Sequence, residues 1–375
     1  MKQSWSLLRV LVFAATLAFW PYVMQGQQYV YTNNNIVKAN STTALKVGNG
    51  GALKVLKTHG TGGLGAGGQV YFGLTTIASA KTSAETCLFV SNGGDSTIAA
   101  FVVDLKTGRL RAVKGSPFGY GVSGAQAGGI GLAANKSTFL FAGNSTDNSI
   151  SVLRISPHCG LTPGHTFRLS GSPDGMKVTP DGNYLIAAYF GGQADSFKIG
   201  MHGSLKELGP FSTQGATAGV DVSCDGRFAY FGDLAANTQV EAFHILAHGK
   251  LKELQNFTNQ NGANSATVLM SADGKRLYVA NTQSNDVMIL TAHEHGKLTY
   301  EGLVKLNKPG MFTLGLTMGK NDPHIFLSEQ GNPEAMGVVK PRRKTLVEVP
   351  NSPFHVIDND DNPASAVALP AFACP

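Results

Sequence analysis

Ionisable side chains that could bind a ligand or act on water occur at the ends of two β runs and in a C-terminal segment. Asp233 and Glu329 each end a short β run, where most of the equivalent runs end in asparagine or tyrosine. His355 and Asp358 lie in a C-terminal segment that contains two further aspartates. Carboxylates in such positions can cap turns, bind calcium or a cationic ligand, or activate water. These four residues are the candidate ligand-binding residues, and no catalytic residue is assigned.

Four histidines lie near a glycine-containing turn in successive repeats: His158, His202, His248 and His295. A metal would need their nitrogens within about 2 Å of one ion. Packed sheets are already about 10 Å apart, so a column with one histidine per sheet cannot converge. We expect solvent-facing hairpin residues, no metal site and no cofactor. The chain also lacks a Walker loop and a G-x-S-x-G nucleophile elbow.

The elements that must position these residues form one repeat used seven times. When the repeats are aligned, two positions recur, and we call each a column. One column is a leucine that follows a turn, usually one with glycine, and the other is a residue, mostly polar, that closes a β run. The first column is Leu53, Leu110, Leu161, Leu205, Leu251, Leu298 and Leu346, and only the turn before Leu346 lacks a glycine. The second is Asn33, Asn92, Asn144, Tyr189, Asp233, Asn281 and Glu329. Two columns with matching periods indicate a repeat architecture.

Each repeat contains four runs of strand length with turn residues between them. The sixth shows this best, with Ala266–Ala272, Arg276–Thr282, Asp286–Ala292 and Leu298–Leu306. Hydrophobic and polar residues alternate there, as half-buried strands require. Four strands repeated seven times predict an all-β, seven-bladed β-propeller of antiparallel strands, and far exceed the strands of a β-sandwich.

The two ends of the chain complete each other. The first repeat begins at Gln28–Asn34, which matches the second strand of later repeats, and Ala364–Pro370 matches the missing first strand. We therefore expect the ring to close with N-terminal strands plus one C-terminal strand, which leaves no open sheet edge at the junction.

The first 26 residues have the order of a secretory signal peptide. Lys2 and Arg9 precede the apolar run Val10–Phe19, which is shorter than the roughly 20 residues of a spanning helix. We expect residues 1–26 to direct export to the periplasm or the medium, with an uncleaved anchor as the alternative, and residues 27–375 to form one propeller. The formal net charge of +6 comes without any block of like charges, so no nucleic-acid partner is expected.

Several segments resemble a known family. Tyr29–Asn33 (YVYTN) and Leu277–Asn281 (LYVAN) resemble the core of the YVTN propeller repeat. Thr107–Val113 followed by Gly115–Phe118 is similar to the blade end of bacterial lactonase-like propellers, and Ser352–Phe354 repeats its last part. The resemblance covers nearly all of residues 28–370. It implies a propeller fold and, as a possible activity, the lactone hydrolysis of 6-phosphogluconolactonase and its relatives.

The resemblance also implies histidine and arginine just before the innermost strands, and these are absent here. The corresponding segments, such as Gly65–Gly68 and Ser172–Gly175, contain neither residue type. Lactone hydrolysis needs a base for water and a group that stabilises the oxyanion. The first hypothesis is therefore an exported propeller that binds a glycan, a peptide or a protein. The second is a lactone-ring hydrolase that uses carboxylates on the face of the ring where the second strands end and the blades are connected.

Four cysteines, Cys87, Cys159, Cys224 and Cys374, allow three complete pairings. The repeat register places Cys87 and Cys374 on one face of adjacent blades, and a bond needs Cα atoms within about 7 Å. We expect a Cys87–Cys374 bridge with two free thiols, or else four unpaired cysteines.

Overall fold

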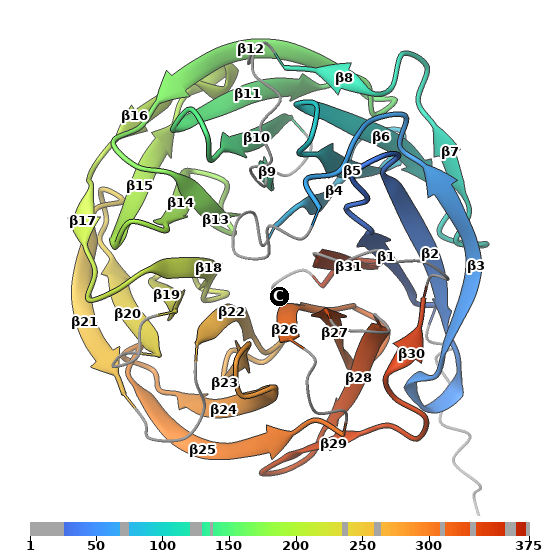
Figure 1. Cartoon of the computed structure of the whole chain (residues 1–375). Helices are drawn as coiled ribbons and strands as arrows, with labels where there is room; N and C mark the ends of the chain where they lie inside the picture. The colour runs from blue at the N-terminus through green and yellow to red at the C-terminus, as the bar shows by residue number, and fades with distance from the viewer. Residues whose placement is uncertain are drawn as a thin grey trace, which may run out of the picture.

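Seven β-sheets surround a common centre in the computed structural model (Figure 1). The structure describes residues 26–67, 75–120, 130–135, 138–234, 239–258, 264–307, 312–330, 335–356 and 365–372. Four of the sheets have four antiparallel strands in radial order, and in the other three a second short strand shares the outermost position, so the predicted seven-bladed propeller is confirmed. None of the helices in these ranges is long and apolar enough to cross a membrane.

Blades 1 to 4 each place their strands in the following order from the centre outward. Blade 1 contains β31 Ser365–Leu369, β1 Tyr29–Asn33, β2 Ser41–Val47 and β3 Leu53–Gly60. Blade 2 contains β4 Ile77–Lys81, β5 Thr86–Asn92, β6 Thr97–Val103 and β7 Leu110–Ala112. Blade 3 contains β9 Ile130–Asn135, β10 Phe139–Asn144, β11 Ser149–Ile155 and β12 Leu161–Arg168. Blade 4 contains β13 Pro173–Val178, β14 Tyr184–Tyr189, β15 Gln193–Ile199 and β16 Leu205–Glu207.

Blades 5 to 7 follow the same order. Blade 5 contains β18 Thr217–Val222, β19 Phe228–Asp233, β20 Val240–Ile245 and β21 Leu251–Phe257. Blade 6 contains β22 Ser265–Met270, β23 Arg276–Asn281, β24 Asp286–Ala292 and β25 Leu298–Lys305. Blade 7 contains β26 Phe312–Met318, β27 Ile325–Gln330, β28 Ala335–Pro341 and β29 Leu346–Glu348. Short outer strands and 3-10 turns complete the described elements: β8 Phe118–Gly119, β17 Phe211–Ser212, β30 Phe354–His355, η1 Asn49–Gly51 and η2 Met201–Gly203.

The two faces of the ring carry different turns. The hairpin face carries the turns between first and second strands and between third and fourth strands of each blade. The connection face carries the turns between second and third strands and the links between blades. The innermost strand of every blade therefore runs from the connection face to the hairpin face.

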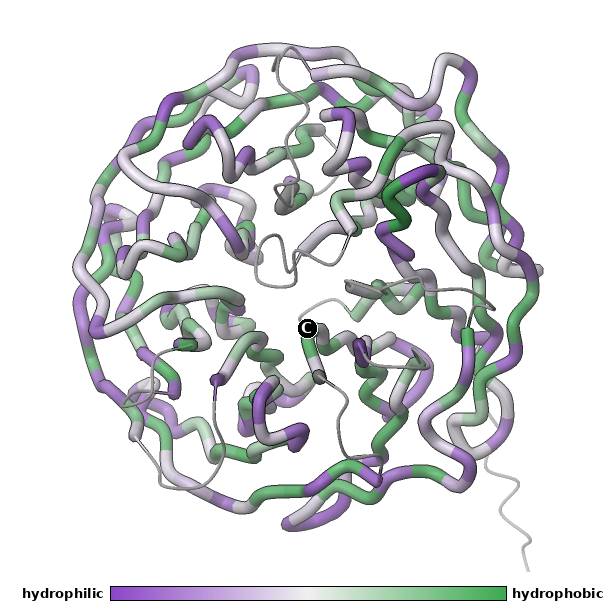
Figure 2. Tube along the Cα trace, in the orientation of Figure 1, coloured by the Kyte–Doolittle hydropathy of each residue, from purple (hydrophilic) through white to green (hydrophobic). Residues whose placement is uncertain are grey.

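The core lies between neighbouring blades. Second strands contribute to two core layers, because alternate side chains point to opposite sides of a sheet. In β5, Phe89 packs toward blade 3, while Leu88 and Val90 pack toward blade 1. The outermost strands are more polar (Figure 2), and β3 and β12 expose most of their residues. Burial of apolar side chains between neighbouring sheets therefore holds each blade to the next around the ring.

Closure of the ring occurs in blade 1, as the sequence predicted. β31 pairs antiparallel with β1 from Tyr29↔Leu369 to Asn33↔Ser365. Ala368 is fully buried in a cluster that includes Val30 of β1 and Phe326 of blade 7. The last strand thus joins the first blade to the seventh.

At the hairpin face, a turn of each blade contacts the start of the second strand of the preceding blade. We call this contact the latch. The glycine of the turn before the fourth strand packs against the ring of an aromatic residue that begins the second strand of the preceding blade. These glycines have φ near +80°, and a Cβ atom on any of them would lie within 3 Å of the ring. The pairs are Gly108–Tyr29, Gly203–Phe139, Gly249–Tyr184 and Gly296–Phe228.

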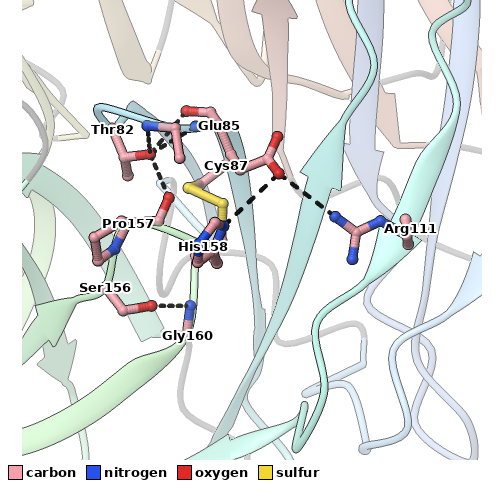
Figure 3. The surroundings of a disulfide bond; sticks show 10 residues. Thr82, Glu85, Cys87, Arg111, Ser156, Pro157, His158 and Gly160 are labelled. Atoms are coloured by element: carbon pink, nitrogen blue, oxygen red, sulfur yellow. Dashed lines mark hydrogen bonds and ion pairs between the residues drawn. A yellow bond between two sulfur atoms is a disulfide. The ribbon is translucent and has the colours of Figure 1, made fainter.

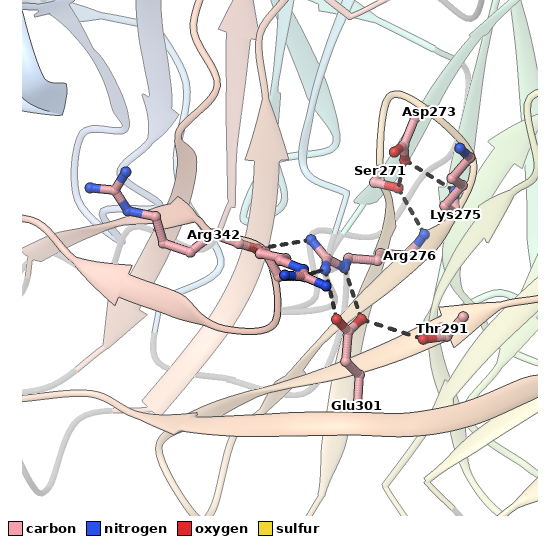
Figure 4. A network of polar contacts seen from close by, with 8 residues as sticks. Ser271, Asp273, Lys275, Arg276, Thr291, Glu301 and Arg342 are labelled. Carbon is pink, nitrogen blue, oxygen red and sulfur yellow. Dashed lines mark hydrogen bonds and ion pairs between the residues drawn. The ribbon is translucent and has the colours of Figure 1, made fainter.

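Polar contacts replace this aromatic latch between blades 6 and 7 (Figure 4). Arg276 begins β23 and donates hydrogen bonds to the backbone carbonyls of Arg342 and Arg343, in the turn before β29. The same guanidinium forms a two-point ion pair with Glu301, with Nε–Oε2 and Nη2–Oε1 distances of 2.8 and 2.6 Å. A planar guanidinium suits this role because it can bind a carboxylate and two carbonyls at once.

Candidate functional site

The central channel widens into a cavity of about 550 Å³ at the hairpin face. The inner strands of blades 4 to 7 and blade 1 supply most of its wall. Its lining is largely aliphatic, with Val222, Leu269, Met270, Leu316 and Val367 among the contributors. Phe372, just after the closing strand, adds an aromatic ring. We call this cavity the channel mouth. An apolar cavity with few polar groups is the usual form of a small-molecule site.

One ion pair lies in the wall of the channel mouth. Lys177 Nζ of β13 is 2.8 Å from Asp221 Oδ1 of β18. The Asp221 carboxylate also accepts hydrogen bonds from the backbone N–H of Val222, at 2.9 Å, and of Met270, at 2.8 Å. Three donors from three adjacent blades therefore hold this carboxylate. Lys177 keeps nearly half of its side-chain surface exposed, so its ammonium can also face a ligand.

A smaller cavity of about 110 Å³ adjoins the channel mouth on the side of the connection face. Glycines allow the inner strands to approach closely: a Cβ on Gly175 would lie 2.3 Å from the Ala218 carbonyl, and one on Gly219 would lie 2.7 Å from that of Ala266. The small residues seen in the sequence thus bring neighbouring strands together rather than enlarge the channel.

Asp233 and Glu329 lie at the connection face, at the opposite end of the inner strands from the channel mouth. Asp233 pairs with Thr217, the first residue of β18, and Glu329 pairs with Thr313 near the start of β26. Both are almost completely buried. Blade 6 lies between their blades, so the structure does not bring the two carboxylates into one site.

A second carboxyl group accompanies Asp233. Glu241, on β20, is also buried and accepts a hydrogen bond from the backbone N–H of Gln214. Burial, together with the nearby charge of Asp233, raises the pKa of Glu241 to about 7, although the hydrogen bond from Gln214 acts in the opposite direction. Blade 4 repeats the arrangement: burial and then Glu207 raise the pKa of Asp195 to about 7, while Tyr189 donates a hydrogen bond to its carboxylate. In blade 6 a different buried carboxylate, Asp286 at the start of β24, is neutralised by Lys305, 2.9 Å away.

The remaining candidates do not join these groups. His355 is exposed on the outer strand β30, where it pairs with Ala335, and Asp358 lies outside the described residues. His158, His202, His248 and His295 are exposed turn residues, as expected. Across the described ranges, no three of the residue types that bind metals come together.

The predicted Cys87–Cys374 bridge is wrong, because Cys87 is bonded to Cys159 (Figure 3). The Cα atoms of this pair are 5.4 Å apart. Cys224 is also disulfide-bonded, so the expectation of two free thiols is wrong as well. Cys374 lies outside the described residues.

The reason for the error lies in the latch between blades. Cys159 occupies the turn position that glycine occupies in other blades, with a φ of 67°. Cys87 lies near the start of β5, where other blades place the aromatic partner. The hydroxyl of Thr82 also donates to the Pro157 carbonyl at 2.7 Å, which ties the same two turns together. The outer turn of blade 3 thus reaches inward over blade 2, whereas the sequence interpretation left it at the rim.

Sequence reasoning also missed Lys177 and Asp221. It examined the residues that precede the inner strands, whereas these two lie inside such strands, at Pro173–Val178 and Thr217–Val222. The sequence did contain a signal, because each of these inner strands carries a charged residue among mostly apolar ones. A charged side chain that is buried in this way requires a partner.

Comparisons with known proteins agree with this architecture. No curated protein sequence gives a significant match. A protein from Bacteroides fragilis, provisionally named a 6-phosphogluconolactonase, aligns with 93% of this chain and 99% of its own, at 18% identity and a TM-score of 0.72. A similarly named protein from Bacteroides uniformis aligns over 92% and 100%, at 18% identity and a TM-score of 0.73.

The periplasmic gluconolactonase of Pseudomonas aeruginosa aligns with 87% of this chain and 98% of its own, at 17% identity and a TM-score of 0.65. At these identities the likeness concerns the fold. The family model described as "Lactonase, 7-bladed beta-propeller" matches residues 79–208 and 199–313, which is more than half of the sequence. The chain therefore belongs to the family of seven-bladed lactonase propellers.

Proposed function

We propose that this protein is an exported propeller that binds a small molecule or a peptide segment at the channel mouth without hydrolysing it. The observation that carries the proposal is the wall of that cavity. It combines an aliphatic lining with one partly exposed ammonium, that of Lys177. A ligand with an apolar body and one anionic group would match both features.

The same wall argues against hydrolysis at this cavity. A general base must accept a proton from water, and the oxyanion of a lactone requires donors placed to receive it. The Asp221 carboxylate is already held by Lys177 and two backbone N–H groups. Moving it toward water would leave the two buried backbone N–H groups unpaired.

Hydrolysis of a panel of five- and six-membered lactones tests the distinction. We expect the wild-type rate to match that of buffer, and Asp221→Asn and Glu329→Gln to leave it unchanged. Turnover above buffer that is lost in Asp221→Asn would establish the second hypothesis, a lactone hydrolase, which membership of the family favours.

Binding is tested separately with hexanoate and hexanol, which share an apolar chain and differ in charge. We expect hexanoate to raise the melting temperature more than hexanol, and Lys177→Met to abolish the difference. Equal responses to both compounds would contradict the role of Lys177.

Export rests on the sequence of residues 1–26. Cell fractionation and the N-terminal mass of the recovered protein test it. Recovery from the cytoplasm with Met1 and Lys2 still present would contradict it.

A further inference from the structure

A second cavity lies on the hairpin face of blade 2, away from the channel. Its volume is about 630 Å³, and four of its twelve lining residues are basic: Lys81, Lys106, Arg109 and Arg111. Glu85 and Asp104 are its acidic residues. We call this cavity the basic groove.

The acidic residues of the groove already have partners. Asp104 accepts hydrogen bonds from the backbone N–H of Lys106, at 2.8 Å, and from the Thr107 hydroxyl, at 2.6 Å. Glu85 lies between Arg111, at 3.6 Å, and His158, at 3.9 Å (Figure 3). None of the ion pairs formed among the described residues includes Lys81, Lys106 or Arg109. The groove thus presents exposed positive charge that its own carboxylates do not neutralise.

The positive charge continues into blade 1. The turn that carries Lys106 and Arg109 packs on that blade, because the Tyr29 hydroxyl donates to the Lys106 carbonyl at 2.8 Å. A Cβ on Gly108 would also lie 2.9 Å from Leu56 of β3. Lys54 and Lys57 lie on the same strand and are exposed. Exposed cations therefore occur on both of these contacting blades and are not confined to the groove itself.

Charge is also unevenly distributed along the sequence, with an excess of positive charge in the part that forms these two blades. Residues 27–120 contain nine lysines and arginines against three aspartates and glutamates. Residues 121–375 contain nineteen lysines and arginines against twenty-one aspartates and glutamates. Blades 1 and 2 therefore form a positive sector on a ring that is otherwise slightly negative. Such a sector attracts extended anions and orients their approach.

The other side chains of the groove narrow the class of anion. The lining contains no aromatic ring on which a nucleic-acid base could stack. Exposed lysines on the edge strand β3 discourage the addition of a peptide strand. A linear acidic polysaccharide needs neither feature, because its carboxylates and hydroxyls can be bound by side-chain donors alone.

We propose that the basic groove and the adjoining lysines of β3 bind a linear acidic polysaccharide. This site is independent of the channel mouth, and the proposal does not depend on what the channel binds.

The experiment measures binding of the protein to polygalacturonate, with neutral dextran as the comparison. We expect binding to polygalacturonate only. It should weaken from about 0.1 M to about 1 M salt, as the Debye length falls from about 10 Å to about 3 Å. Equal binding to dextran, or no binding to either polymer, would overturn the proposal.

The chain offers a matched pair of double variants. Arg109→Gln with Arg111→Gln removes two exposed charges around Leu110 in blade 2. Lys250→Gln with Lys252→Gln removes two around Leu251, at the equivalent positions of blade 5. We expect the blade 2 variant to bind polygalacturonate about tenfold more weakly, since charge-assisted hydrogen bonds are lost, and the blade 5 variant to bind like wild type.

Equal losses in both double variants would show an effect of net charge alone and would contradict a site. Duplex DNA or anionic phospholipid vesicles bound as tightly as polygalacturonate would also overturn the proposal. Because all four substituted residues are exposed, an unchanged melting temperature confirms that each variant is folded.

Discussion

Cys159 holds the left-handed turn position of blade 3 that glycine holds in other blades, and its sulfur is bonded to Cys87 of blade 2. Between blades 4 and 5 the same relationship is made by Gly249 and the ring of Tyr184. The disulfide is therefore a covalent version of a latch that the ring repeats. This equivalence allows the two kinds of latch to be exchanged.

Replacing the disulfide with an aromatic latch tests the equivalence. Removing it in Cys87→Ala with Cys159→Ala should lower the free energy of unfolding by about 2–4 kcal/mol, as for a cross-link of a long loop. Cys87→Phe with Cys159→Gly should recover part of this loss. Cys87→Phe alone should be less stable than that double variant, because the side chain at position 159 would meet the ring. Urea denaturation of the three variants measures the order.

The result that would contradict the latch is a Cys87→Phe, Cys159→Gly protein less stable than the double alanine variant. Peptide mapping of unreduced wild type supplies the control, because it should recover Cys87 linked to Cys159.

The latch also shows how far the sequence could predict the structure. Repeated columns set the blade count, the strands and the closing strand, because burial and turn chemistry recur with the repeat. The second repeated column, from Asn33 to Glu329, could have located the latch, because latch residues stand five positions before it. These are Cys87, Phe139, Tyr184, Phe228, Arg276 and His324, whose ring packs against Gly51 of blade 1. The repeated columns do not show that each of these turns extends inward over the preceding blade, because that contact depends on the curvature of the ring.

The candidate site was harder to predict for a similar reason. Asp233 and Glu329 were correctly placed at the ends of second strands, but a strand end is accessible only if nothing covers it, and both are buried. The Lys177–Asp221 contact depends on the spacing of inner strands from neighbouring blades, which no local pattern specifies.

The Lys177–Asp221 pair should contribute unequally to stability. Asp221→Ala leaves two backbone N–H groups and an ammonium without their acceptor, so we expect a loss of about 1–3 kcal/mol in the free energy of unfolding. Lys177→Met should cost less, because this side chain is partly exposed. The surface pair Arg227–Asp225 provides the control, and Arg227→Gln should have almost no effect. Equal losses in Asp221→Ala and Arg227→Gln would contradict the structural role of Asp221.

Ring closure by β31 should be sensitive to a single buried charge. Ala368→Asp keeps the chain complete but places a carboxylate in the core between blades 1 and 7. We expect insoluble protein or a large fall in melting temperature, and the same after truncation at Asn362. A truncated or Ala368→Asp protein as stable as wild type would refute closure by this strand.

The buried carboxyl groups of blades 4 and 5 predict how stability changes with pH. The pKa values of Asp195 and Glu241 are about 7 in the folded protein, against ordinary values of 3.8 and 4.5. Between these limits the folded state holds protons that the unfolded state has released. Their contribution to stability should therefore be complete below about pH 4 and be lost as pH rises to about 7.

Glu241→Gln isolates this effect, because it replaces the carboxyl group with a neutral group of the same shape. We expect its free energy of unfolding to fall less than that of wild type between pH 5 and pH 8. Exposed Glu294 provides the control, and Glu294→Gln should keep the wild-type slope. A Glu241→Gln protein with the full wild-type slope would show that Glu241 does not carry it.

The pairing of β31 with β1 also bears on when the molecule can fold. Tyr29 and Leu369 are partners at opposite ends of the chain, so the contact that completes blade 1 closes nearly the longest loop available. Contacts between distant parts of a sequence are slow to form, because the chain must find them by diffusion. During synthesis, every other blade can assemble while the ring stays open on the ribosome. The native ring can therefore be completed only after Leu369 and the rest of β31 have been synthesised and have left the ribosome.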